Sequence, residues 1–292
     1  MKRKLVKQGA ATMMISLPSK WIKENGLDKG DEIELIEQGG ELLIKSRESQ
    51  EHNNLKINLS GFHPLTNQIV IASYIKGIDE LEILFDNRED MKNLKKHVIE
   101  DLLGFEIIKQ TQTSLVIKSV AEAAKQEIDE ILKRIFFILD SMAEELLIAI
   151  ENKQDASPVI EMDSSVNKFV YFCLRNLNIN GYKEYNKTTQ IYGIASLLEE
   201  IGDIYKQIAK SLQNKIKIEK SQIKILQDIK ESLKLFSELL FGFNKETAVK
   251  FANNYESIKK RIKGKNSVDS FLYQLNEVII RMNNYLLVNA FN

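Results

Sequence analysis

Proline is scarce in this chain, and this scarcity most constrains how the chain can fold. Only three prolines occur in 292 residues, at positions 18, 64 and 158. Because proline interrupts helices, a sequence that lacks it can form long uninterrupted ones. From Ser119 onward apolar residues recur at helical spacing, and we predict helices at about 119–152, 158–178, 185–214, 219–241, 245–263 and 267–290. These six helices predict an all-α bundle over 119–292, built from two pseudo-repeats of three helices.

Residues 1–47 have a different character, because short apolar strands alternate there with glycine turns. Strands are predicted at 5–7 and 12–17, followed by a short helix up to Gly26 and a β-hairpin over 33–44. So small a module has few large apolar side chains and contains no cysteine or histidine. Below about 40–50 residues one core rarely suffices without metals, disulfides or oligomerisation. We therefore expect two copies to combine their strands into one core.

Charge is sorted along the same module. Its first basic residues all precede the first acidic residue, Glu24, and they are Lys2, Arg3, Lys4, Lys7, Lys20 and Lys23. The whole chain is neutral, with a formal net charge of +0 and a pI near 6.9. Only a local surface of this kind could therefore hold phosphates. For Lys2 alone, a solubilising tip is an equal alternative.

Three segments of the module carry a family resemblance: RKLVKQG at 3–9, MISLPSKW at 14–21 and GLDKGDEI at 26–33. Together they resemble the AbrB/MazE/SpoVT swapped-hairpin family over nearly all of residues 1–47. The resemblance implies an interlocked homodimer that lays basic residues on DNA. The DNA-binding residues implied for this chain are Arg3, Lys4, Lys7, Lys20 and Lys23. Trp21 could stack on a base, but we expect it to fill the small core, since aromatic side chains bury large apolar areas.

Residues 53–118 alternate between predicted strands and helices, after a polar linker at 46–54. The strands are expected at 55–59, 81–85, 105–109 and 115–118, and the helices at 64–76 and 90–103. This βαβαββ order predicts a small α/β domain of the βαββ type. The first helix carries an apolar stripe formed by Leu65, Ile69, Ala72 and Ile75. No chemical motif accompanies these elements, so a dimer contact, a spacer and a small-ligand sensor all stay open as roles.

Two carboxylates lie four residues apart on the predicted helix at 185–214. Glu199 and Asp203 are expected on one face, nearly opposite the apolar stripe of the helix. Like charges at this spacing repel, and a bound divalent cation would turn that cost into a gain. The alternative is an ordinary solvated face, in which Lys206, three residues after Asp203, neutralises that carboxylate without any metal.

The stretch from Leu198 to Lys210 resembles the Leu-Glu-x-Ile-Gly-Asp…Ile-Ala signature of PhoU proteins, within a looser resemblance over 119–292. The family implies surface metal clusters on the bundle, holding a divalent or an iron- or zinc-type ion. The implied ligands in this chain are Glu199, Asp203 and Asp163. The sequence departs from the pattern at Asn167, where a carboxylate is expected, and both carboxylates are absent from 280–284 of the second repeat. At most one cluster is therefore expected.

The three parts together resemble the archaeal phosphate-uptake-regulator PhoU proteins. The resemblance implies a homodimer without enzymatic activity that binds DNA and regulates phosphate uptake. A second hypothesis is an adaptor that does not bind DNA and contacts a phosphate-transporter ATPase or a sensor kinase. An antitoxin is a weaker third hypothesis, because antitoxin tails of this head type are usually short and extended. An enzyme has the least support, because no nucleophile accompanies the grouped carboxylates.

The remaining features concern the cellular compartment. Cys173 is the only cysteine, which excludes an internal disulfide and indicates a reducing compartment. It lies in an apolar run, so we expect a small buried side chain. No apolar run reaches the about 20 residues needed to span a bilayer, and the basic start has no apolar core behind it. We therefore expect a cytoplasmic protein without membrane insertion. The histidines at 52, 63 and 97 do not have the spacing of a zinc site.

Overall fold

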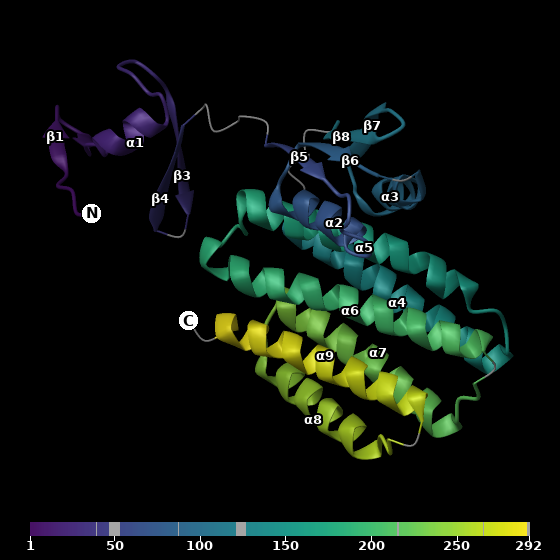
Figure 1. Cartoon of the computed structure of the whole chain (residues 1–292). Coiled ribbons are helices and arrows are strands. Elements are labelled where there is room, and N and C mark those ends of the chain that lie inside the picture. The colour runs from purple at the N-terminus through teal and green to yellow at the C-terminus, as the bar shows by residue number, and fades with distance from the viewer. Residues whose placement is uncertain are drawn as a thin grey trace. The chain divides into compact units, whose positions relative to one another are not determined.

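The computed structural model of the chain describes residues 1–38, 40–46, 53–86, 88–120, 127–214, 216–264 and 266–290. It contains two compact units, Met1–Asn53 and Asn54–Asn292 (Figure 1). We call the first unit the head and the second the body. Most of the predicted linker at 46–54, His52, and Gly39 of the predicted hairpin turn lie outside the described residues.

The head consists of short elements in the order strand, strand, helix, strand, strand. They are β1 (Val6–Gln8), β2 (Thr12–Met14), α1 (Ser19–Glu24), β3 (Ile33–Gln38) and β4 (Glu41–Ser46). β1 pairs antiparallel with β2, and β3 with β4. Gly9 has a φ of +73° in the tight turn after β1, a left-handed conformation that favours glycine. The predicted order of elements is therefore confirmed, although β2 ends at Met14 and does not include Leu17.

The body begins with a mixed four-stranded sheet and two helices. In chain order these are β5 (Asn54–Asn58), α2 (Thr66–Lys76), β6 (Glu80–Leu84), α3 (Arg88–Asp101), β7 (Phe105–Gln110) and β8 (Ser114–Ser119). The strand order is β5-β6-β8-β7, in which β5 and β6 run parallel and the other pairs antiparallel. Because side chains alternate along a strand, Ile83 of β6 and Ile117 of β8 enter a shared core, whereas Glu82 lies on the opposite face. The predicted βαβαββ order is confirmed.

The predicted apolar stripe of α2 is buried only in part, since Ile69 and Ile75 pack against the sheet core. Leu65 and Ala72 are exposed, and the buried residues of the helix are Thr66, Val70, Ser73 and Tyr74. Apolar residues fill most positions from 69 to 75, so their spacing does not select one face. The helix is also covered on two sides, because Ile75 packs against both the sheet core and the bundle core.

Long helices, with one short 3₁₀ helix at Tyr185–Lys187, form the rest of the described body (Figure 1). They are α4 (Ile128–Asn152), α5 (Ser157–Asn180), α6 (Thr188–Gln213), α7 (Lys220–Phe241), α8 (Lys245–Arg261) and α9 (Ser267–Ala290). Helices α4, α5 and α6 contact one another, as do α7, α8 and α9, and the pairs α4–α7 and α6–α9 join the two halves. All the predicted helices are present. The first does not begin at Ser119, which ends β8, and residues 121–126 lie outside the described part.

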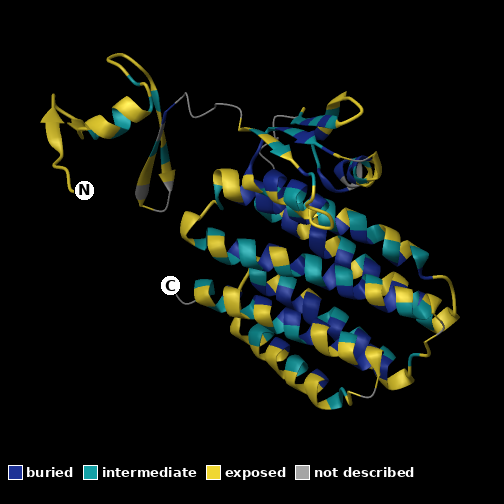
Figure 2. Ribbon diagram, in the orientation of Figure 1, coloured by how far each residue is buried: buried dark blue, intermediate teal, exposed yellow. Residues whose placement is uncertain are grey.

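Buried residues concentrate inside the bundle and between the sheet and its helices, whereas the head is largely exposed (Figure 2). Cys173 is fully buried in the bundle core, as predicted, and burial raises its pKa to about 12. No helix in the described ranges has both the length and the apolar character needed to cross a bilayer.

A buried arginine joins the sheet region to the bundle. Arg175 of α5 donates hydrogen bonds to the carbonyl oxygens of Tyr74 at 2.7 Å and Ile78 at 2.8 Å, where α2 ends. The last carbonyls of a helix lack partners within the helix and attract cations. The guanidinium also lies 5.0 Å from the ring centre of Tyr74 and 5.1 Å from that of Phe105. The α/β region and the bundle are therefore held together by polar as well as apolar contacts.

Candidate nucleic-acid interface and carboxylate cluster

The predicted DNA-binding side chains are all exposed on the head. Arg3 and Lys4 precede β1, Lys7 lies in β1, and the lysines at 20 and 23 lie on α1. Lys20 forms an i,i+4 ion pair with Glu24 at 3.6 Å, and exposed pairs of this kind contribute little to stability. These exposed cations can therefore contact the phosphate oxygens of DNA without the loss of a strong interaction within the head.

The head leaves its large apolar side chains uncovered. None of those in the described residues of the head is buried, and Trp21, expected to fill the core, is only half-buried. Every residue of β1 and β2 is exposed, including Val6 and Met13. A soluble monomer rarely exposes apolar area of this kind without a partner.

The second hairpin of the head has one clearly apolar face. The register pairs Leu35 with Ile44 and places Ile33 and Leu42 on that same face of β3 and β4. Leu35 is 56% and Leu42 52% exposed. An interlocked dimer would bury this apolar strand face and leave the exposed cations of the head in contact with solvent.

The carboxylates predicted on the bundle lie between helices. Asp163 of α5 is only 3% exposed, and both Glu199 and Asp203 of α6 are half-buried. The expectation that both face outward is wrong for Glu199, because α6 packs against α4, α5 and α9, whereas the side chain of Asp203 is 45% exposed. The hydroxyl of Tyr171 on α5 approaches Glu199 Oε1 at 3.5 Å.

The environment shifts the acidity of this carboxylate cluster. Burial raises the pKa of Glu199 to about 7, and the nearby charges of Asp203 and Asp163 add to the rise. Burial also raises the pKa of Asp163, against the opposing effect of Lys206. Glu199 therefore exchanges its proton near neutral pH.

Lys206 provides the cation of the cluster. Its ammonium lies 2.5 Å from Asp163 Oδ2 and 3.4 Å from Asp203 Oδ1, so the anticipated Asp203–Lys206 pair is present. Burial lowers the pKa of Lys206, but the carboxylates of Asp163 and Asp203 outweigh it and the net shift is upward. The lysine stays charged at physiological pH.

The donor set does not fit a metal ion as it stands. The amide of Asn167 faces Asp163 Oδ2 at 3.5 Å, and the Lys206 ammonium takes the place between the two aspartates. Across the described ranges, no three His, Cys, Asp or Glu side chains are grouped so that they could hold a metal. The three predicted ligands lie in one region of the bundle, but sequence spacing alone could not show that Lys206 lies between the two aspartates.

Residues 6–51 match the family described as antidote-toxin recognition MazE, bacterial antitoxin. The match covers the head and supports the predicted swapped-hairpin type of fold there. It does not extend into the sheet or the bundle of the body. Neither a curated protein nor a solved structure matches the chain.

Proposed function

We propose that this chain is a homodimeric, non-enzymatic, DNA-binding regulator. The observation that carries the proposal is the head, where exposed cations accompany apolar strand faces that remain exposed in the single chain. The family match at residues 6–51 supports the same assignment. Two heads would close their apolar faces on each other and leave the cations outside.

The cations before and in β1 are proposed as the principal DNA contacts. Arg3, Lys4 and Lys7 would contact backbone phosphates, with Lys20 and Lys23 of α1 as further contacts. Phosphate contacts position a protein on the duplex and carry no sequence information directly. Affinity for DNA should therefore depend steeply on salt.

The body is proposed to carry the regulatory signal, which we assign to phosphate supply. This finer assignment is supported by the PhoU-like stretch from Leu198 to Lys210 and by the two three-helix halves of the bundle. A signal can reach the head only if the body has two arrangements that favour different states of the DNA-binding dimer. Because Lys206 lies between the aspartates, we assign that signal to a protein contact rather than to a metal.

An antitoxin is the second candidate, and the description of the matching family favours it. An antitoxin would bind DNA through the same head and would also bind a toxin. The folded body is the argument against it, since a toxin-binding tail of this head type is usually short and extended.

The decisive experiment is a salt titration of binding to the DNA upstream of the chain's own gene. Binding should weaken steeply with salt, and the double variant Lys4→Ala/Lys7→Ala should flatten the slope of log K against log salt by about 1 for each phosphate that is no longer neutralised. Lys29→Ala is the matched control, because Lys29 is exposed on the same head but belongs to its acidic part. Absence of binding to any duplex at low salt would refute the regulator and favour the adaptor.

A further inference from the structure

Phe137 of α4 projects from the surface of the bundle. It is 72% exposed, more than any other large apolar side chain in the described body. Aromatic side chains supply much of the binding energy at protein interfaces, because they bury a large area with few rotatable bonds. An aromatic ring this exposed on a long helix therefore indicates a surface that can bind a partner.

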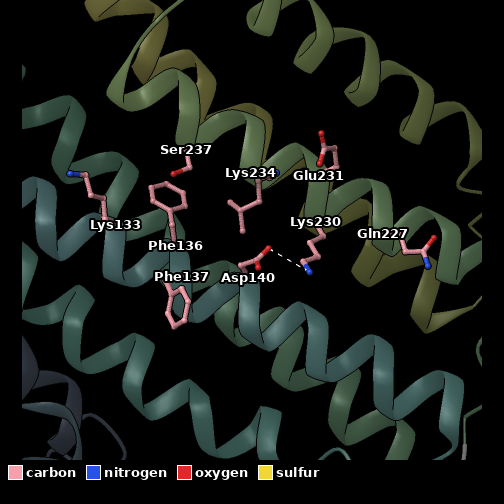
Figure 3. Close-up of a pocket in the computed structure, with 10 residues that line it drawn as sticks. Lys133, Phe136, Phe137, Asp140, Gln227, Lys230, Glu231, Lys234 and Ser237 are labelled. Carbon is pink, nitrogen blue, oxygen red and sulfur yellow. Dashed lines mark ion pairs between the residues drawn. The ribbon is translucent and has the colours of Figure 1, made fainter.

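The ring stands at the edge of a groove of about 520 Å³ between α4 and α7 (Figure 3). Helix α4 contributes Lys133, Phe137 and Asp140, and helix α7 contributes Gln227, Lys230 and Lys234. Spacings of three and four residues keep each set on one face of its helix. Each face extends over about two turns, or roughly 10 Å. Two helix faces side by side form a seat for a third helix.

The carboxylates that line the groove are already paired. Asp140 lies 3.7 Å from Lys230, and Glu231 lies 2.9 Å from Lys250. Lys234 has no carboxylate partner within the described parts of the chain. Lys230 also pairs with Glu144, and Lys133 pairs with Glu130. Among the charged side chains that line the groove, Lys234 is thus the one without an ion-pair partner in the described ranges, and the charge it offers to a ligand is positive.

A second groove, of about 760 Å³, runs on the other side of Phe137 between α4 and α5. Arg134 lines it and stacks over the ring of Phe169, with its guanidinium carbon 4.3 Å from the ring centre. Arg134 likewise has no carboxylate partner among the residues that the structure describes. The exposed aromatic ring thus lies between two unbalanced cations, Arg134 and Lys234.

We propose that the groove between α4 and α7 binds an acidic amphipathic helix of a partner protein. The apolar face of that helix packs on Phe137, and its carboxylates pair with Lys234 on one side and Arg134 on the other. Electrostatic complementarity of this kind selects the partner and speeds association, while the aromatic contact supplies most of the affinity. The site does not depend on DNA binding by the head.

The test uses the full chain and two labelled helical peptides of about 20 residues, long enough to form a helix. Both carry the same apolar stripe, flanked by Glu in one peptide and by Lys in the other. Fluorescence anisotropy should show the acidic peptide binding at least tenfold more tightly. Phe137→Ala should weaken that binding by about tenfold or more, and Lys234→Glu should remove the preference for the acidic peptide. Both side chains are accessible, so circular dichroism and thermal unfolding should stay unchanged.

Tyr273→Ala and Lys210→Glu are matched controls, because both residues are exposed on the bundle and line neither groove. Equal binding of the two peptides, binding of neither, or an equal loss in the controls overturns the proposal. A Phe137-dependent association of the chain with itself also overturns it, by assigning the groove to a second copy. These peptide-binding measurements keep their meaning even if the head does not bind DNA.

Discussion

The guanidinium of Arg175 lies 2.6 Å from Asp79 Oδ1, although 96 positions separate the two residues in the chain. The pair links the C-terminal part of helix α5 to the segment that follows α2, so one side chain contacts both the bundle and the sheet region. Arg175 is buried and Asp79 is partly exposed. The stabilising contribution therefore comes as much from the carbonyls that Arg175 caps as from the ion pair itself.

Replacing Arg175 should lower the free energy of unfolding of the body, because this side chain connects the sheet region to the bundle. Arg175→Ala removes the guanidinium donor from the Ile78 carbonyl, the Asp79 carboxylate and the Tyr74 carbonyl, which keeps the N–H of Gly77, and we expect a loss of about 2–4 kcal/mol. Arg175→Lys should lose about 1–2 kcal/mol, because an ammonium cannot reproduce the planar fork. Urea unfolding followed by far-UV circular dichroism measures both, with Arg281→Lys, an exposed ion-paired arginine of α9, as the control. Equal stability of Arg175→Lys and Arg281→Lys would show that the fork is unimportant.

Glu199 should make the stability of the body depend on pH. Its pKa is raised to about 7 in the folded protein, above the value of 4.5 of a free side chain, so the folded state binds the proton more tightly than the unfolded state does. The free energy of unfolding should therefore fall as pH rises from about 4.5 to about 7, and then level off. After discounting for solvent screening we expect the change to be about 1–2 kcal/mol.

The variant Glu199→Gln isolates this contribution. It should be more stable than the parent chain at pH 8 by about 1–2 kcal/mol and similar to it at pH 4.5, where the parent carboxyl is protonated. Glu161→Gln, at an exposed position of α5, controls for the loss of one charge. A difference between Glu199→Gln and the parent that is the same at both pH values would contradict this account.

Gly193 of α6 and Tyr285 of α9 should be energetically coupled. A Cβ at position 193 would lie 2.6 Å from Cζ of the Tyr285 ring, well inside contact distance. Alanine usually stabilises a helix interior by about 1 kcal/mol relative to glycine, and the clash should cancel that gain. In a Tyr285→Ala background, Gly193→Ala should recover it. A double-mutant cycle measured by urea unfolding should give a coupling energy of about 1–2 kcal/mol, and additive effects would show that the ring moves aside at no cost.

A charge on the open strand faces of the head should prevent dimer formation. Val6→Asp or Leu35→Asp would place a carboxylate where the second copy is expected to pack, and burying it unpaired costs several kcal/mol. Light scattering should report a monomer, and the emission of Trp21, the single tryptophan, should report loss of structure in the same head. Ala10→Asp, at an exposed position of the turn between β1 and β2, should leave the dimer intact. A parent chain that is monomeric with a folded head would refute both the dimer and the proposed DNA grip.

Local pattern was enough to predict most of the elements, and tertiary context explains the errors. The long helices and the βαβαββ order of elements follow from periodicity and turn residues. In the α3 region, Met91, Leu94, Val98 and Leu102 recur at helical spacing and are buried. The same reasoning was only partly right for α2 and failed for Glu199, because both helices are covered on more than one side. A helical wheel identifies one buried face and carries no information about a second neighbour.

The sequence indicated that Arg175 needs a partner, but it did not identify that partner. It follows the apolar run from Phe169 to Leu174, so a charged residue stands on a helix otherwise expected to be buried. That signal indicates a partner, because buried charges are nearly always paired. Identifying the partner as the end of a helix about a hundred positions earlier required the tertiary structure.

Helix α5 carries Asp163, which contacts Lys206 of α6, and Arg175, which holds the end of α2. Residues 163 and 175 are a little over three turns apart, roughly 18 Å along one rod. A rod held at two such places transmits a tilt with little bending. A shift of α5 that starts at its contact with α6 would therefore also move the end of α2, from which the chain continues into β6 of the sheet.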